Sequence, residues 1–258
     1  MNSSDSILPY DILIEITNNL SYDDTINFLL QDLQLSKSIE SEYFWQKKSF
    51  AKFRQSLPVI QGVHPAIIYK NLELVNYCLQ NNSVNDCLMK FINTNSTIPV
   101  QILLTISDIP ENVLSMAFST LMSKRYTLNF PARERGNTKD SSGRFIIKPF
   151  QKTTLNPDVL PLINILSKIV RSYSWSDFAN IMRNNDITLV KILMTNFKAK
   201  VLVLNLIDVA ITHDKLEILD MILNYHQNLF TSQDLSNIIL RYTTKPKVQE
   251  ILWKYIKD

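Results

Sequence analysis

The feature that most constrains the fold is an apolar motif that recurs at a fixed interval in the C-terminal part of the chain. An apolar residue followed three and four positions later by two more apolar residues begins at Val190, Leu219 and Val248, in two steps of 29 residues. The segments before these motifs repeat in step, with Phe178, Ile207 and Ser236 and then Ile181, Ala210 and Ile239. A period of about 30 residues with two helices per unit is typical of a stacked solenoid. We therefore predict an all-α fold built largely from stacked helix pairs.

The same pattern continues more loosely toward the N-terminus. Similar motifs begin at Leu162, Val100 and Val75, which brings the predicted number of helix pairs to six. Coincidence among unrelated amphipathic helices is the alternative, but three units that agree at both helices make it the weaker interpretation. The repeats are predicted to occupy residues 57–258.

Residues 1–56 form a separate unit in this prediction. Pro9 suits the first turn of a helix, and apolar residues then recur at helical spacing up to Leu20. Ser21 with Asp24 resembles a capping box that starts a second helix, with Ile26, Leu29 and Leu30 facing inward. A third helical stretch is predicted to end at residues 43–45, and Leu57-Pro58 closes the unit.

One segment, residues 123–157, interrupts the repeats inside the third pair. The sequences YTLNF (126–130) and FIIKPF (145–150) alternate in character and predict an inserted two-stranded β-hairpin. From Lys124 to Lys152 there are eight basic and two acidic residues, whereas the whole chain carries a net charge of only +3. The candidate partner-binding residues are Arg133, Arg135, Arg144, Lys148 and Lys152.

Two interpretations of this basic insertion stay open. Its cations are suited to an acidic or phosphorylated partner, and nucleic acid is a further alternative. The plainer interpretation, which we favour, is a solvated insertion, because Glu134 and Asp140 interrupt the run of positive charge.

The chain lacks the residues of the common enzyme motifs. Its three glycines, Gly62, Gly136 and Gly143, are too few and too scattered for a dinucleotide fingerprint, a phosphate-binding loop or a nucleophile elbow. The three histidines do not have metal-ligand spacing, and two cysteines do not make a disulfide framework. We therefore expect no catalytic residues, no metal and no cofactor, and hence no enzyme.

Targeting signals are also missing from the sequence. The N-terminus lacks the basic and apolar regions of a secretory signal, and the most apolar stretches are shorter than the ~20 residues of a membrane span. We expect a soluble protein of the cytoplasm or nucleus that does not bind membranes.

The segment LPYDILIEITNNLSYDD (8–24) resembles the F-box, with an aromatic pair, Phe44-Trp45, and Phe50 near the closing positions of that motif. Thr25 stands where an aliphatic residue is usual. The resemblance implies a three-helix module that binds a Skp-type adaptor of cullin–RING ubiquitin ligases. Carried over residue by residue, the adaptor-binding positions are Leu8, Pro9, Ile12, Leu13, Ile16 and Leu20. The alternative is a helical cap that only closes the core of the repeats.

The repeats resemble ankyrin repeats, particularly NNDITLVKIL (184–193) and DKLEILD (214–220), although the Thr-Pro-Leu-His signature and the hairpin glycines are absent. An F-box ahead of ankyrin-like repeats, in a chain rich in Asn, Ile and Lys, is similar to proteins of large DNA viruses of amoebae. The resemblance implies a substrate-receptor subunit, in which the N-terminal module binds the adaptor and the solenoid holds a target protein. A non-catalytic ankyrin-like scaffold and nucleic-acid binding through the hairpin are the alternatives.

Overall fold

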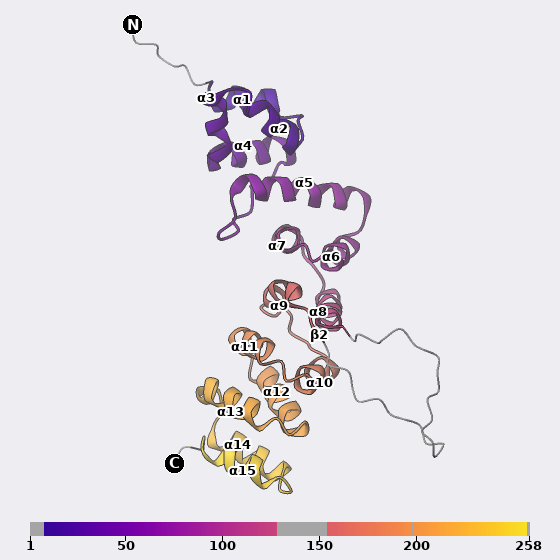
Figure 1. Ribbon diagram of the computed structural model, residues 1–258, viewed down its shortest axis with the longest axis vertical. Helices are drawn as coiled ribbons and strands as arrows, with labels where there is room; N and C mark the ends of the chain where they lie inside the picture. Colours follow the sequence, from indigo (N-terminus) through magenta and orange to yellow (C-terminus); the bar gives the residue numbers. More distant parts are fainter. Residues whose placement is uncertain (1–7, 128–153, 198, 257–258) are drawn as a thin grey trace, which may run out of the picture. The chain divides into compact units, whose positions relative to one another are not determined.

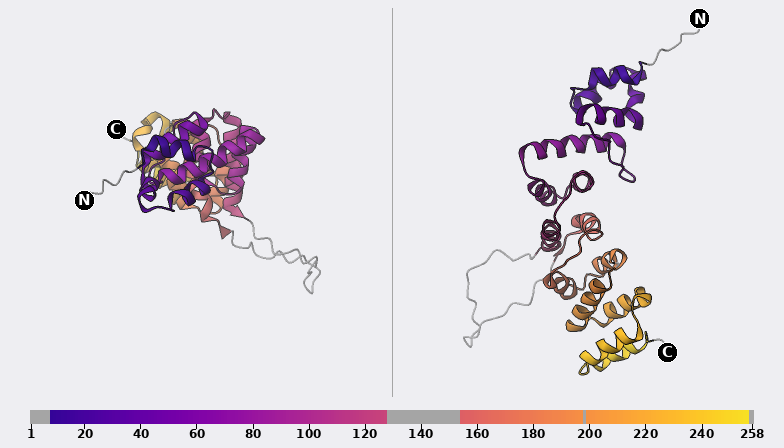
Figure 2. Two further views of the ribbon diagram at one scale, coloured as in Figure 1. Left: turned by 90° about the horizontal axis from the view of Figure 1, so that it is seen from above. Right: turned by 180° about the vertical axis from the view of Figure 1, so that it is seen from behind.

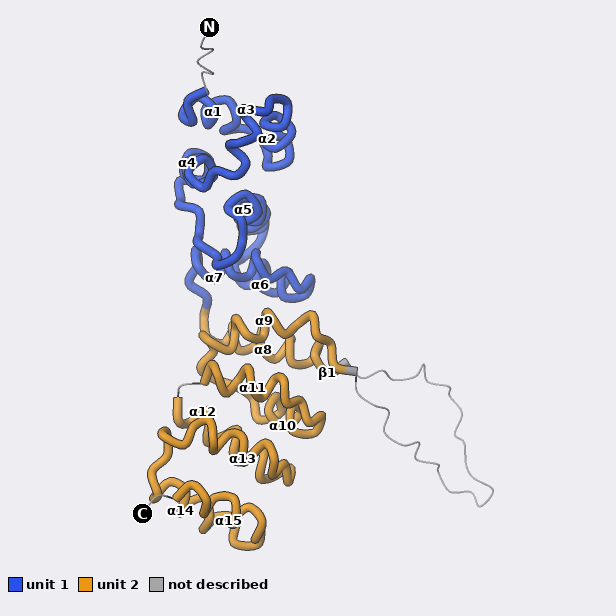
Figure 3. Tube along the Cα trace, turned by 60° about the vertical axis from the view of Figure 1, so that its left-hand side comes forward, with its two compact units in different colours: residues 1–109 blue, residues 110–258 orange. Residues whose placement is uncertain are grey.

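The structure, a computed structural model, describes residues 8–127, 154–197 and 199–256. These residues form an almost entirely helical chain that divides into two compact units, residues 1–109 and 110–258 (Figure 3). The all-α fold class is therefore confirmed. None of the described helices is both long and apolar enough to cross a membrane.

Unit 1 begins with a bundle of short helices and continues with three longer ones (Figure 1). Serine side chains cap several of them: Ser21, Ser41 and Ser83 each accept a hydrogen bond from the backbone N–H three residues on, which satisfies a donor that the first helical turn leaves free. The helices are α1 (Tyr10–Thr17), α2 (Tyr22–Leu29), α3 (Leu33–Ser36), the 3-10 helix η1 (Lys37–Glu40), α4 (Glu42–Phe53), α5 (Pro65–Asn81), α6 (Val84–Asn93) and α7 (Thr97–Ile106).

The N-terminal bundle differs from the predicted three helices. Residues 43–45 lie in the first turn of α4 instead of ending a third helix, because Ser41 caps a new helix at that point. The core of the bundle contains Leu13, Leu29, Phe44 and Trp45, all without exposed surface. Leu30, predicted to face inward, is 61% exposed because it lies at the C-cap of α2.

Helix α5 joins this bundle to the helices that follow. It packs against α4 on one side and against α7 on the other, so the division of the structure does not fall at the predicted boundary near residue 56. Its 17 residues form one continuous helix, where the sequence pattern predicts the first helix pair. Pro65 at its start and the absence of a breaker before Asn81 explain why this segment stays a single helix.

The described residues of unit 2 form four helix pairs, and Figures 1 and 2 show how these helices are arranged. The second helices form one layer, with contacts from α9 to α11, from α11 to α13 and from α13 to α15, and the first helices α10 and α12 contact each other in the other layer. The elements are α8 (Glu111–Arg125), β1 (Tyr126–Thr127), β2 (Thr154–Leu155), η2 (Pro157–Val159), α9 (Leu160–Leu166), α10 (Trp175–Arg183), α11 (Ile187–Asn196), α12 (Lys200–Thr212), α13 (Leu216–Tyr225), η3 (Gln227–Leu229), α14 (Ser232–Arg241) and α15 (Pro246–Trp253).

The 29-residue pattern coincides with burial. Val190, Leu219 and Val248 are at most 1% exposed, which confirms that the motif marks inward positions. Within the first helices, Phe178 and Ile207 are buried as well, whereas Ser236 is half-buried.

The turns inside the pairs follow the same interval. Asn185 and Asp214, 29 residues apart, adopt left-handed backbone with φ of 51° and 53°, as does Asn95 between α6 and α7. In each case the N–H of the next residue bonds to the carbonyl five positions back, as in Asp186 to Ile181 and Lys215 to Ala210. These are Schellman turns in which Asn or Asp takes the place that glycine commonly fills, and they explain how the chain forms tight turns with so few glycines.

Two short strands lie at the ends of the insertion. Tyr126 pairs with Leu155 and Thr127 with Thr154 in antiparallel register. The predicted first strand, 126–130, overlaps β1 at these first two residues, whereas the predicted second strand, 145–150, lies outside the described residues.

Candidate functional site

Helix α1 carries most of the residues predicted to bind an adaptor, and the structure separates them onto two faces. Leu13, Ile14 and Thr17 point into the bundle, with exposed fractions of 0%, 8% and 0%. Ile12 and Ile16 lie on the outer side and are 44% and 48% exposed. This division follows from helical geometry, because residues four apart share a face.

The other predicted positions flank that outer face. Pro9 is exposed at the N-cap of α1, while Leu8 and Leu20 are half-buried at its two ends. Leu13, by contrast, has no exposed surface and belongs to the core, so its side chain is not available to a partner. A surface of Pro9, Ile12 and Ile16, here called the α1 face, therefore remains.

Acidic side chains border the α1 face. Asp11 and Glu15 are exposed on the same helix, next to the two isoleucines. A partner that covers this face therefore meets aliphatic surface beside two carboxylates, and an apolar patch with basic residues at its edge complements it.

Two lysines of α4 hold the C-terminal end of α1 and the turn that follows it. Lys48 donates to the carbonyl oxygen of Thr17, and Lys52 donates to that of Leu20 at 2.9 Å. Cations are favourable at this position because helix carbonyls there have no intrahelical partner. Burial of Lys48, reinforced by the neighbouring charge of Lys52, lowers its pKa to about 8.

Glu73 of α5 completes this polar cluster. Its carboxylate accepts from Lys52 at 2.7 Å and from the backbone N–H of Tyr22 at 2.8 Å. The cluster thereby fixes the start of α2 and the end of α1 to α4 and α5, and the α1 face is built on a rigid support.

An aromatic cluster supports the same region from inside. The Trp45 ring lies 5.0 Å from Phe44, 5.7 Å from Tyr22 and 5.1 Å from Tyr69. Its indole N–H donates to the carbonyl of Ile39 at 2.8 Å, so the buried ring has its one donor satisfied. The Phe44-Trp45 pair therefore forms core, whereas Phe50 is 55% exposed.

Further apolar side chains of the bundle are exposed, and sequence reasoning missed most of them. Leu33 in α3 is 88% exposed and Tyr43 in α4 is 51% exposed. Tyr43, Lys47 and Phe50 follow the i, i+4, i+7 spacing of one helix face, and Lys47 lies over the Tyr43 ring at 5.4 Å. The sequence contains this spacing, but the spacing alone does not show which face of α4 is exposed.

The predicted partner-binding residues Arg133, Arg135, Arg144, Lys148 and Lys152 all lie outside the described residues. The structure does show how the insertion begins and ends. Arg125, the last residue of α8, forms a buried ion pair with Asp186, with Nε and Nη2 at 2.9 and 3.2 Å from the two carboxylate oxygens. Arg125 also donates to the carbonyl of Asn156 at 2.6 Å.

Asp186 is the centre of this arrangement. It caps α11 by accepting from the N–H of Leu189, and the Tyr126 hydroxyl donates to it at 3.3 Å. The ion pair thus joins both ends of the insertion to the turn between α10 and α11. It also neutralises Arg125, which the sequence-based charge count assigns to the basic segment.

Reactive groups are sparse in the part of the chain that the structure describes. Within it, no group of three or more His, Cys, Asp or Glu side chains is placed to hold a metal ion. Cys78 and Cys87 are both buried and unbridged, and burial, together with the adjacent Cys78 thiol, raises the pKa of Cys87 to about 12. A thiol with that pKa is protonated at neutral pH and is a poor nucleophile.

Comparisons with known proteins identified no relative of this chain. A scan against protein-family models, a search of curated proteins and a search of solved structures each found no match to this chain.

Proposed function

We propose that this chain is a non-enzymatic substrate receptor that links a target protein to a Skp-type adaptor and, through it, to a cullin–RING ubiquitin ligase. The N-terminal bundle binds the adaptor, and the helix pairs provide the surface for the target. The chain contributes proximity, by holding the target near the ligase, and performs no chemistry itself.

The observation that carries the proposal is the exposure of the α1 face. Ile12 and Ile16 stay about half exposed although the bundle beside them has a well-packed core, and both belong to the F-box-like pattern. Neighbouring apolar side chains turned outward with a rigid support beneath them are typical of a protein-binding surface. Leu13 is buried and cannot contact a partner. The proposed centre of the adaptor-binding surface is therefore Pro9, Ile12 and Ile16, flanked by Leu8 and Leu20.

A second candidate function has an observation in its favour. The bundle packs against α5 through Trp45 and Tyr69 and through the Lys52–Glu73 ion pair, as a cap for the following helices would. A scaffold in which the bundle is only a cap needs these contacts and does not need the α1 face.

A binding experiment with a purified Skp-type adaptor separates the two candidates. Ile12→Glu and Ile16→Glu place a charge on the α1 face and should each weaken adaptor binding by at least about tenfold, because burying an unpaired carboxylate opposes association. Val59→Glu is the matched control, since Val59 is 87% exposed in the loop after α4 and outside the α1 face.

All three variants should retain the melting temperature of the parent protein, because the altered side chains lie at the surface. If the adaptor fails to bind the parent protein, or binds it and both isoleucine variants with equal affinity, the bundle is a cap and the receptor proposal is wrong.

A further inference from the structure

The outer side of helix α4 carries aromatic and basic side chains. Tyr43 and Phe50 are each more than half exposed, and Lys47 between them is exposed as well. These three residues share one side of the helix because they follow one another at intervals of four and three positions. Arg54, also exposed, lies at the C-cap of the same helix. Tyr43, Lys47, Phe50 and Arg54 are here called the α4 face.

The positive charge of the α4 face is not neutralised by the described part of the chain. Neither Lys47 nor Arg54 forms an ion pair with a described residue, and the Lys47 amine lies over the Tyr43 ring, 5.4 Å from its centre. Glu42, the one acidic residue of α4, lies about 100° around the helix from Tyr43. The face therefore combines apolar rings with two available cations.

The α1 face has the opposite character. Ile12 and Ile16 supply aliphatic surface, and the exposed carboxylates of Asp11 and Glu15 border it. Neither carboxylate forms an ion pair with a described residue. One face of the bundle is thus aliphatic and acidic, whereas the other is aromatic and basic. Two such surfaces complement each other both in apolar area and in charge.

The two faces cannot meet within one copy of the chain. Helix α1 packs on α4 (Figure 1), and the Tyr10 ring lies 5.6 Å from that of Tyr43 and 6.3 Å from that of Phe44. Ile12 and Ile16 are turned away from α4, because they lie about 120–160° around the helix from Tyr10. A second copy can bring its α1 face to the α4 face, and both surfaces are already folded.

We propose that the chain self-associates by placing the α1 face of one copy on the α4 face of another. The isoleucines pack against the aromatic rings, and the carboxylates lie opposite the two cations. Burial of apolar surface favours the contact, and the charges fix its orientation. A second copy is the occupant because this chain supplies both halves of the contact. Two short helices form a small interface, so we expect a dissociation constant on the order of 50 μM.

Self-association has a consequence for the adaptor. It covers the α1 face, and therefore a second copy competes with an adaptor for that face. At concentrations well below the dissociation constant, the chain is a single copy whose α1 face is free. The competition rests on the proposed receptor function, whereas the self-association does not.

Sedimentation velocity of the full chain at about 1–300 μM tests the contact. The sedimentation coefficient of the parent should rise with concentration, and less so at high salt. Asp11→Lys with Glu15→Lys reverses the charge of the α1 face, and Lys47→Glu with Arg54→Glu reverses that of the α4 face. Each double variant alone should associate at least about tenfold more weakly, because like charges then meet. An equimolar mixture of the two should associate, because opposite charges meet again.

Lys90→Glu with Lys191→Glu is the matched control. It changes the net charge as much as reversal of the α4 face does, at two exposed positions outside both faces. This control should self-associate as the parent does. A parent that remains a single copy at every concentration would overturn the proposal. Reversed variants that associate as strongly as the parent, or an equimolar mixture that does not associate, would overturn it as well.

Adaptor binding separates this proposal from the receptor function. The variant with a reversed α4 face keeps its α1 face, so at nanomolar chain concentration it should bind the adaptor with the affinity of the parent. Excess adaptor added to the associated parent should produce complexes with one copy of the chain, and complexes that keep two copies would overturn the proposal. Self-association without adaptor binding would contradict only the receptor function, and adaptor binding without self-association would contradict only this proposal.

Discussion

Lys48 lies in an environment that its charge does not favour. Its side chain is fully buried, donates to the carbonyl of Thr17 and lies 5.5 Å from the centre of the Tyr69 ring. Burying a cation costs free energy unless partners compensate, and here the end of α1, the ring of Tyr69 and the carboxylate of Glu73 share that role. The compensation is incomplete, and burial therefore lowers the pKa of Lys48.

The lowered pKa of Lys48 should make the stability of the folded protein depend on pH. Its pKa in the folded protein is about 8, against 10.5 when unperturbed, so between these values the unfolded chain binds more protons. Stability therefore rises with pH across this interval. Relative to Lys48→Met, which cannot titrate, the parent protein should gain about 1 kcal/mol between pH 7 and pH 9. Urea unfolding of both proteins at each pH measures the difference.

Other groups also titrate in this pH interval, but their contributions to stability occur in both proteins and cancel in the comparison with Lys48→Met. Cys87 ionises in both proteins when they unfold, and Lys52 and Glu73 are present in both. Parallel stability profiles for the two proteins would show that the Lys48 amine keeps its ordinary pKa and is hydrated.

At the residue scale, the sequence predicted the helix α1 but not which of its apolar residues are buried and which are exposed. The spacing of Ile12, Leu13, Ile16 and Leu20 is compatible with a single apolar stripe, and only the position of α4 decides that Leu13 is buried while Ile16 is not. Lys48 follows Phe44 by four positions, which places it on a buried face, but propensity alone assigns a lysine to the surface. Whether such a side chain is buried or exposed depends on neighbours that are distant in sequence.

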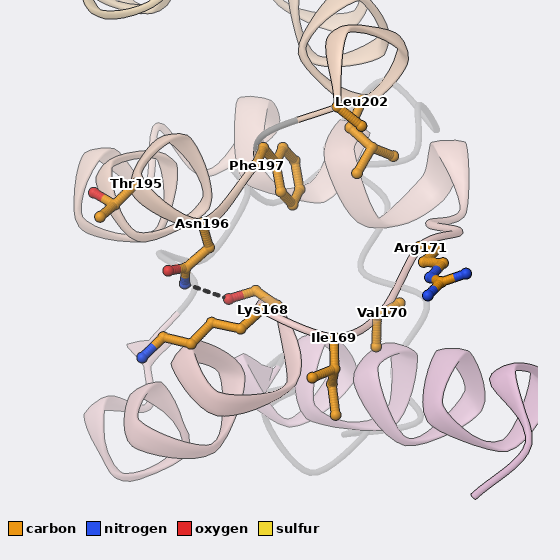
Figure 4. A pocket seen from close by; sticks show the side chains of 10 residues that line it. Lys168, Ile169, Val170, Arg171, Thr195, Asn196, Phe197 and Leu202 are labelled. Carbon is orange, nitrogen blue, oxygen red and sulfur yellow. Dashed lines mark hydrogen bonds between the residues drawn. The ribbon is translucent and has the colours of Figure 1, made fainter.

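The helix pair is the element that sequence reasoning described best. The interval of 29 residues between Val190, Leu219 and Val248 corresponds to buried positions and to the repeated left-handed turns. Helical periodicity is a local property, and therefore it can be read from a single sequence. The pairing of Arg125 with Asp186 arises from a contact between pairs, and so does the pocket that Val170, Phe197 and Leu202 help to line (Figure 4). The sequence contains no comparable signal for either.

Leu219 should be among the least replaceable side chains of unit 2. It has no exposed surface, so Leu219→Asp places an unpaired charge in the core and should cost at least ~3 kcal/mol of stability. Asn224→Asp adds the same charge to an exposed position of α13 and should cost less than about 1 kcal/mol. Thermal and urea unfolding of the two variants provide the measurement. Equal, small effects would mean that the 29-residue interval does not mark the packing positions.

At the scale of the whole molecule, the proposal assigns different tasks to the two compact units. Unit 1 contains the α1 face, supported by the polar cluster of Lys48, Lys52 and Glu73. Unit 2 contains the helix pairs and the buried Arg125–Asp186 ion pair at the ends of the insertion. The proposed receptor function needs one surface for the adaptor and another for the target, and the proposal assigns them to different compact units. The basic insertion between β1 and β2 keeps its two interpretations: a solvated insertion, which we favour, or a contact for an acidic partner.

Binding of a Skp-type adaptor to the α1 face can be detected by hydrogen–deuterium exchange of the full chain with and without the purified adaptor. Amides in residues 8–20 should exchange more slowly in the complex, because a partner covers the outer side of α1, while those of α13 should be unchanged. Ile16→Glu should abolish this protection without altering exchange in the free protein. Absence of a complex, or a complex in which residues 8–20 exchange as in the free chain, would mean that the α1 face does not bind the adaptor.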